Sequence, residues 1–192
     1  MIHLENRGAI AVMTIDRPER RNALDHDALA GFETALDALE AGAARAVVLT
    51  GADGNFCSGA DISGVEDPAF VDRLGQVLRR IRVLQMPTIA AVEGFCLGAG
   101  AQLAVACDLR MATAISRFGV PAGKLGVQID WWTVERVASA MGQGAARELL
   151  LTADQITGDR AYALGLVQRV GDLADAIEWA ERIATLAPLT VQ

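Results

Sequence analysis

Residues 88–107 read TIAAVEGFCLGAGAQLAVAC, and this stretch decides the fold. It opens with an apolar run of the length of a buried strand, and a glycine-dotted turn follows from Gly94 to Gly100. The remaining residues, 101–107, are apolar apart from Gln102, so a helix here lacks a polar face and has to be enclosed by protein. A buried strand, a glycine turn and an enclosed helix in succession predict an α/β fold with this helix at its centre.

Strands and helices alternate on both sides of this stretch, which predicts parallel crossovers. The elements before it are strands at 2–6 and 9–15 around the turn Arg7-Gly8, a helix from its cap Asp25 to Gly42, a strand at 46–50, a loop at 51–59, and a helix from Asp67-Pro68 that stops before Met86-Pro87. The elements after it are strands at 109–112 and around Phe118, helices at 131–141, 143–152 and 161–164, a strand at 167–170 and a helix at 173–186. Because 187–192 has the pattern of the first turn of another helix, we expect the C-terminal helices to be missing or to begin at about residue 188.

The composition predicts one folded domain over residues 1–192. Of the 192 residues, 52% are hydrophobic and 21% are charged, which is enough apolar material for a core. The net charge of −7 repels phosphate backbones, so we expect no nucleic-acid partner. The longest uncharged stretch, 95–107, is shorter than the about 20 residues of a membrane span, and residues 1–5 lack the layout of a signal peptide.

The cysteines argue against both a disulfide framework and a metal site. Cys57, Cys96 and Cys107 are odd in number, far apart and never in a C-x-x-C pattern. No activating neighbour is evident beside them, so we expect buried, unreactive thiols in the core. Free thiols without a secretion signal favour the reducing cytoplasm.

Two loops that follow buried strands are candidates for chemistry, 55–62 and 93–100. Ligands of α/β sheets bind at such strand ends, and glycines let a backbone approach a ligand closely. Two backbone N–H groups that converge on one oxygen form an oxyanion hole, which holds a developing negative charge. The alternative is that the glycines only permit close packing. A dinucleotide site is a weaker alternative, because Leu103 stands at the third glycine position after Gly98-Ala-Gly100 and no acidic residue follows at the required distance.

Four blocks of sequence carry a more specific signal. They are RPERRNALD at 17–25, FCSGADI at 56–62, AVEGFCLGAG at 91–100 and FGVP at 118–121. In their order and spacing these blocks resemble the signatures of the enoyl-CoA hydratase/isomerase family, the crotonase family, and LTADQITG at 151–158 and ALGLV at 163–167 extend the resemblance across nearly the whole chain. The resemblance implies a crotonase-like spiral of β-β-α units, an acyl-CoA or enoyl-CoA ligand, no cofactor other than the CoA of that ligand, and assembly as a homotrimer or hexamer.

The resemblance assigns the thioester oxygen to two backbone N–H groups, those of Ala60 and Ala99. The second position is usually glycine in the family, but alanine still supplies an N–H donor. The resemblance also implies the residues around the ligand: Gly59, Ala60, Asp61, Ile62 and Ser63 along the thioester and pantetheine, and Arg21, Asn22 and Ala23 on the CoA side. We expect Asp61 to organise its loop rather than to act as a base. The arginines within 17–21 either offset the CoA phosphates or belong to a solvated turn.

The chain departs from the family where its hydratases carry their two glutamates. Those positions hold Gln102 and Ala122 here. An amide holds water or a carbonyl by hydrogen bonds but exchanges no proton near neutral pH, and alanine does neither. Since the loss of one well-placed acid or base costs about 10²- to 10⁴-fold in rate, we expect little hydration.

Asp130 is the remaining carboxylate, and the resemblance puts a catalytic aspartate at this position in dienoyl-CoA isomerases and aryl-CoA dehalogenases. Enclosure by Phe118, Trp131 and Trp132, the expected acyl pocket, would suit it to the proton transfer of double-bond migration. The alternative is that Asp130 caps the helix that begins at Trp131. The sequence therefore leaves two functions open: an acyl-CoA protein with isomerase-like chemistry, or a non-catalytic acyl-CoA binder or partner-docking subunit that has lost its acids.

Overall fold

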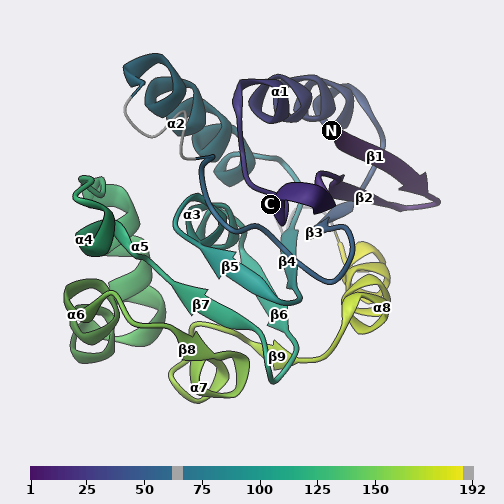
Figure 1. Ribbon diagram of the computed structural model, residues 1–192. Helices are drawn as coiled ribbons and strands as arrows, with labels where there is room; N and C mark the ends of the chain where they lie inside the picture. Colours follow the sequence, from purple (N-terminus) through teal and green to yellow (C-terminus); the bar gives the residue numbers. More distant parts are fainter. Residues whose placement is uncertain (62–66, 188–192) are drawn as a thin grey trace.

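The computed structural model describes residues 1–61 and 67–187, and its strands and helices alternate as the sequence predicts (Figure 1). The strands are β1 (Ile2–Arg7), β2 (Ile10–Ile15), β3 (Ala46–Gly51), β4 (Thr88–Val92), β5 (Phe95–Leu97), β6 (Leu109–Ala112), β7 (Arg117–Gly119), β8 (Ile156–Thr157) and β9 (Arg169–Val170). The helices are the 3₁₀ helix η1 (Pro18–Arg20) and α1 (His26–Ala41), α2 (Pro68–Arg82), α3 (Ala99–Ala106), α4 (Ala122–Leu125), α5 (Trp131–Met141), α6 (Gln143–Thr152), α7 (Gly158–Ala163) and α8 (Leu173–Ala184).

The strands form two sheets, and the chain passes from one sheet to the other in each turn. A six-stranded sheet has the order β1-β2-β3-β4-β6-β9, and a three-stranded sheet has the order β5-β7-β8. β4 of the large sheet is followed by β5 of the small sheet and then by α3, and β6, β7 and α4 repeat this course. A β-bridge between Cys57 and Cys96 brings the segment after β3 into the same pattern. This confirms the expected spiral of β-β-α units.

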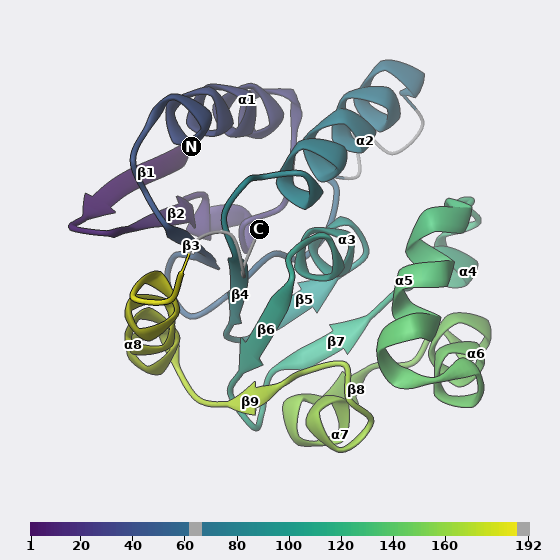
Figure 2. The same ribbon diagram turned by 180° about the vertical axis from the view of Figure 1, so that it is seen from behind.

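The central strands are buried on both faces, which explains their unbroken apolar sequences. In β3, Ala46 and Val48 pack in a cluster with the small residues of α8, whereas Val47 and Leu49 belong to the larger cluster that contains α1 and α3. Figure 2 shows α8 against the large sheet, where it packs across β2, β3 and β4. The large sheet is therefore a middle layer, and α3 lies deep in the larger cluster as predicted.

Local sequence signals placed the long elements correctly. Gly8, at φ +63°, turns the hairpin of β1 and β2, and the side chain of Asp25 accepts the hydrogen bond of the Ala28 N–H at the start of α1. Asp67 caps α2 in the same way, with Pro68 as the first helical residue. The predicted helices at 131–141 and 143–152 have the observed bounds of α5 and α6.

The short elements differ from the prediction. The expected glycine turn 94–100 contains β5, and α3 begins at Ala99 instead of residue 101. β8 and α4 were not predicted, the helix expected at 161–164 is α7 (Gly158–Ala163), and the strand expected at 167–170 is reduced to β9. β5 has three residues, and its partners are β7 and Cys57, which are distant in sequence. Such pairing comes from tertiary contacts, so local periodicity does not reveal it.

Candidate functional site

A cavity of about 680 Å³ opens between α2, the start of α3 and the segment 120–132. In Figure 1, α2 lies on one side of α3, and α4 and α5 lie on the other. The cavity wall contains these residues that the sequence selected: Gly59, Ala60, Ala99, Gln102, Ala122, Asp130 and Trp132. Residues from three separate stretches of the chain, 59–60, 99–102 and 122–132, thus meet on one surface, together with apolar side chains of α2.

The backbone N–H of Ala60 faces away from the neighbouring chain segment. Ala60 is bridged to Leu24 in parallel orientation. The Leu24 N–H donates to the Gly59 carbonyl at 2.8 Å, and the Asp61 N–H donates to the Leu24 carbonyl at 2.7 Å. Because successive N–H groups of an extended segment alternate in direction, the Ala60 N–H points to the opposite side. In the part of the chain that the structure describes, it has no protein acceptor.

The backbone N–H of Ala99 is the first of α3, and the first N–H groups of a helix have no acceptor within that helix. The Gln102 N–H makes the first bond, to the Gly98 carbonyl at 3.0 Å. Among the described residues the Ala99 N–H has no protein acceptor either. A Cβ placed on Gly59 would lie 3.9 Å from the Ala99 nitrogen, so the two turns adjoin. Two free donors therefore stand on adjoining turns at the cavity wall.

Backbone hydrogen bonds of the small sheet hold these two turns. The Cys57 N–H donates to the Phe95 carbonyl at 2.8 Å, and the Leu97 N–H donates to the Cys57 carbonyl at 3.0 Å. The Gly98 N–H donates to the Gly119 carbonyl at 3.0 Å. Gly59 has φ +117°, and a Cβ there would lie 3.1 Å from the Leu97 carbonyl oxygen, so this close approach requires glycine.

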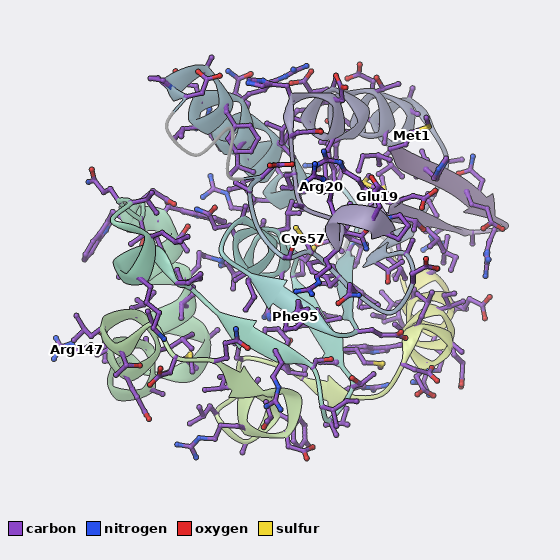
Figure 3. The ribbon with its side chains drawn as sticks, viewed as in Figure 1. Met1, Glu19, Arg20, Cys57, Phe95 and Arg147 are labelled. Carbon is purple, nitrogen blue, oxygen red and sulfur yellow. The ribbon has the colours of Figure 1, made fainter. Side chains whose placement is uncertain are left out.

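The thiols near these turns are buried, as expected. Figure 3 shows Cys57 in the interior of the molecule. Burial raises the pKa of Cys57 to about 12, and it raises the pKa of Cys107 to about 12 as well. Burial also raises the pKa of Cys96 well above its ordinary value. Thiols in this state are poor nucleophiles at neutral pH.

Gln102, Asp130 and Thr133 form a hydrogen-bonded group at the cavity wall. Gln102 Nε2 donates to Asp130 Oδ2 at 2.7 Å and to Thr133 Oγ1 at 3.0 Å. Thr133 donates to Asp130 twice, from Oγ1 to Oδ2 at 2.6 Å and from its backbone N–H to Oδ1 at 2.9 Å. A carboxylate only accepts hydrogen bonds, so this contact fixes which end of the Gln102 amide faces Asp130. Asp130 thus caps α5, as one alternative predicted, and its carboxylate contacts the side chain of Gln102.

The expected acyl pocket forms only in part. Trp132 lines the cavity, but the prediction is wrong for Trp131, which is 76% exposed. Adjacent helical residues point about 100° apart, so α5 presents only one of the two tryptophans to the cavity. Phe118 is buried in the core behind the wall, because β7 lies in the small sheet between other elements. Asp130 is consequently exposed at the cavity instead of enclosed.

The residues expected on the CoA side lie next to the cavity but do not line it. The Ser58 N–H donates to the Arg21 carbonyl at 3.1 Å, and Ser58 is part of the wall. The side chain of Asn22 is buried and bonds to three backbone groups, so it holds the loop and faces no ligand. Ala23 is also buried. The predicted contact of Arg21 with CoA stays a prediction.

Asp61 is held by an arginine, which fits its expected role as an organiser. Arg17 Nη1 lies 3.0 Å from Asp61 Oδ2, and Arg17 Nη2 lies 2.9 Å from Asp25 Oδ2. Arg17 is therefore engaged within the protein, whereas Arg20 is exposed on η1 (Figure 3). Ile62 and Ser63, which the resemblance placed along the ligand, lie outside the described residues.

Sequence reasoning missed three residues of this site. Thr133 follows the cap Asp130 by three residues, and the backbone N–H at that position is the usual donor to an aspartate cap, so the spacing is a signal for this contact. Arg79 and Arg82 line the cavity from α2. Arg82 follows the buried Leu78 by four residues, so the helical spacing places it beside the buried stripe of this helix. Over residues 1–61 and 67–187 we find no cluster of side chains suited to a metal ion, and no helix there could span a membrane.

Comparison with known proteins identifies the family of the chain. The model of the family described as enoyl-CoA hydratase/isomerase matches residues 5–192. A protein named "Probable enoyl-CoA hydratase echA6" from Mycobacterium bovis is 40% identical over 193 residues, which cover 100% of this chain and 79% of that protein. The short-chain-enoyl-CoA hydratase of Clostridium acetobutylicum is 37% identical, with 98% of this chain and 77% of that protein covered.

Solved structures agree as well. The crystal structure of a putative enoyl-CoA hydratase/isomerase family protein from Hyphomonas neptunium has a TM-score of 0.92 and 35% identity, and the match covers 98% of this chain and 78% of that chain. The Bacillus anthracis enoyl-CoA hydratase has a TM-score of 0.93 and 28% identity, with 99% and 79% covered. The sequence blocks, the spiral and these relatives together show that the chain belongs to the enoyl-CoA hydratase/isomerase family, the crotonase family.

Proposed function

We propose that the protein binds an acyl-CoA or enoyl-CoA thioester in this cavity, with the thioester oxygen between the N–H groups of Ala60 and Ala99. The observation that supports this is the pair of N–H donors without a protein acceptor, on adjoining turns at one cavity wall. The start of α3 adds the partial positive charge of a helix N-terminus. Fixed donors of this kind stabilise the negative charge that develops on a thioester oxygen when a neighbouring carbon loses a proton.

We propose proton transfer, and not hydration, as the chemistry. Gln102 and Ala122 supply no acid or base at the two glutamate positions, whereas Asp130 presents an oriented carboxylate at the cavity. Asp130 would take a proton from the carbon next to the thioester and return it two carbons further along, while the double bond moves between them. The electrons pass through the enolate oxygen that Ala60 and Ala99 hold. The step needs no cofactor beyond the CoA of the ligand.

A non-catalytic acyl-CoA binder is the second candidate. Asp130 accepts three hydrogen bonds from Gln102 and Thr133, which leaves little of its carboxylate free for substrate. In this candidate the role of the group is structural: its hydrogen bonds hold α3 and α5 together. In either case we keep two proposals from the resemblance: the chain assembles as a homotrimer or hexamer, and it acts in the cytoplasm.

Calorimetry with hexanoyl-CoA, together with a crotonyl-CoA hydration assay, tests the proposal. We expect binding without efficient hydration, with turnover at least about 10²-fold below that of a two-glutamate hydratase measured in parallel. Equal turnover would show that the roles given to Gln102 and Ala122 are wrong. Absence of binding would refute the thioester site.

The change Asp130→Asn separates the two candidates. If Asp130 moves the proton, isomerisation of a 3-enoyl-CoA falls about 10²- to 10⁴-fold, while hexanoyl-CoA binding persists because asparagine still caps α5. Asp172→Asn makes the same change at the cap of α8, far from the cavity, and is the matched control. An isomerisation rate equal to that of this control, with unchanged thermal unfolding, would leave capping as the role of Asp130 and favour the binder.

A further inference from the structure

The cavity wall formed by α2 carries two arginines that thioester binding does not use. Arg79 and Arg82 both line the cavity, and within the described residues neither has an ion-pair partner. The other two arginines of the helix face α1 and are paired there: Arg73 with Glu33 at 2.6 Å, and Arg80 with Asp37 at 2.7 Å and with Glu40 at 3.0 Å. The arginines of α2 that face α1 are therefore paired, and the arginines of α2 that line the cavity are not.

Both unpaired guanidinium groups lie along the cavity. A Cβ placed on Gly75, another wall residue, would lie 3.5 Å from Arg79 Nη1, so this side chain runs back over the glycine along the helix. Arg82 extends from α2 toward α5, where its Cζ lies 5.8 Å from the centre of the Trp132 ring. A guanidinium over an aromatic ring keeps its N–H donors free at its edge.

Contacts along α3 place these arginines beyond the N–H pair. Gln102 is about one helical turn further along α3 than Ala99, roughly 4.5 Å along the axis. Gln102 contacts Asp130, and Trp132, the partner of Arg82, follows two residues later. An acyl chain that leaves the N–H pair and passes Gln102 therefore meets the arginines next.

The acidic residues of the wall do not balance the arginines. Asp130 is engaged with Gln102 and Thr133 through both of its oxygens. Asp72 lines the wall on the same helix as Arg79 but forms no ion pair with it. In a protein of net charge −7, two unpaired arginines beside an acyl path suit an anionic group of the ligand.

We infer that Arg79 and Arg82 bind a carboxylate at the far end of the acyl chain, so that the preferred ligands are ω-carboxyacyl-CoA thioesters. This inference rests on the proposed thioester binding. Arginine pairs with a carboxylate through two parallel hydrogen bonds, which gives specificity as well as affinity. The CoA phosphates offer similar chemistry, and the experiment separates the two sources.

The test compares adipyl-CoA, hexanoyl-CoA and free CoA by calorimetry at low salt. The first two have acyl chains of equal carbon number and differ in the terminal carboxylate. We expect the wild type to bind adipyl-CoA about 10- to 100-fold more tightly than hexanoyl-CoA, and we expect higher salt to reduce this preference. The double variant Arg79→Gln with Arg82→Gln loses the preference and keeps its affinity for hexanoyl-CoA. Arg147→Gln, which removes an exposed charge from α6 (Figure 3), retains the preference.

Two results would overturn the inference. Equal wild-type affinities for adipyl-CoA and hexanoyl-CoA would show that no carboxylate is recognised. Equal weakening of all three ligands in the double variant would assign the arginines to the CoA phosphates. If the wild type did not bind hexanoyl-CoA, the thioester proposal itself would be wrong, a result distinct from the other two. Both side chains are exposed, so thermal unfolding of the variants should match that of the wild type.

Discussion

Replacement of Ala99 by proline is expected to weaken the polarisation of a bound thioester strongly, because one of its two N–H donors is lost, while α3 stays folded. Proline is well tolerated at the first position of a helix, and Ala99 occupies that position. The N–H that proline removes has no protein acceptor among the described residues, so its removal breaks no hydrogen bond there and only the bond to the ligand would be lost. Removal of one oxyanion donor costs about 10²- to 10³-fold in rate, and we expect this loss in enoyl isomerisation.

The infrared carbonyl stretch of bound hexanoyl-CoA gives a direct measurement. In the wild type it should lie below its frequency in water, and in Ala99→Pro it should return toward that frequency. Ala99→Gly keeps the N–H and is the matched control, so its carbonyl should stay shifted. A low-frequency carbonyl that persists at saturation in the proline variant would contradict the role of this donor.

Arg110→Met is expected to destabilise the protein by about 3–5 kcal/mol. Arg110 is 6% exposed, and its guanidinium donates to four backbone carbonyls, those of Ala104, Cys107, Asp108 and Leu166. Burial lowers the pKa of Arg110 from its ordinary value. Methionine fills part of the volume, but it leaves the carbonyls of Ala104, Cys107 and Asp108 at the end of α3 without this donor, and the Leu166 carbonyl keeps only its longer bond from Gln168 Nε2 at 3.3 Å.

Urea unfolding measures this effect as a lower transition midpoint. Arg147→Met provides the control, since Arg147 is exposed on α6 and its loss should change stability by less than about 0.5 kcal/mol. Arg110→Lys keeps the charge with fewer donors, and its transition midpoint should lie between those of Arg110→Met and the control. Equal midpoints for Arg110→Met and the control would show that the carbonyls find other donors at little cost.

The long elements could be predicted because their signals are local, whereas the two donors were predicted from the resemblance to a family. Asp25, Asp67 and Asp130 each stand directly before a helix and cap it. The resemblance of four blocks, in their order and spacing, to a known family selected Ala60 and Ala99 as donors, and the structure brings both to one cavity wall. The capping signals need only a few neighbouring residues, but the resemblance needs blocks that span about a hundred.

The group of Gln102, Asp130 and Thr133 could not be predicted in the same way. It joins residues that are 28 and 31 positions apart, and its contacts exist only after α3 and α5 have packed. The sequence offered catalysis and capping as alternatives for Asp130, but it contained no sign that Gln102 would contact this carboxylate. Such contacts depend on the angle between two helices.

The rate at which the buried thiols are alkylated also measures how often the structure around them opens. An alkylating reagent reacts with an accessible thiolate, so it should modify Cys57 only in molecules in which that side chain becomes transiently exposed. Cys57 precedes the turn that carries the free N–H of Ala60, whereas Cys107 lies at the far end of α3. The ratio of their labelling rates therefore distinguishes local opening of the turn next to Cys57 from cooperative unfolding of the whole domain.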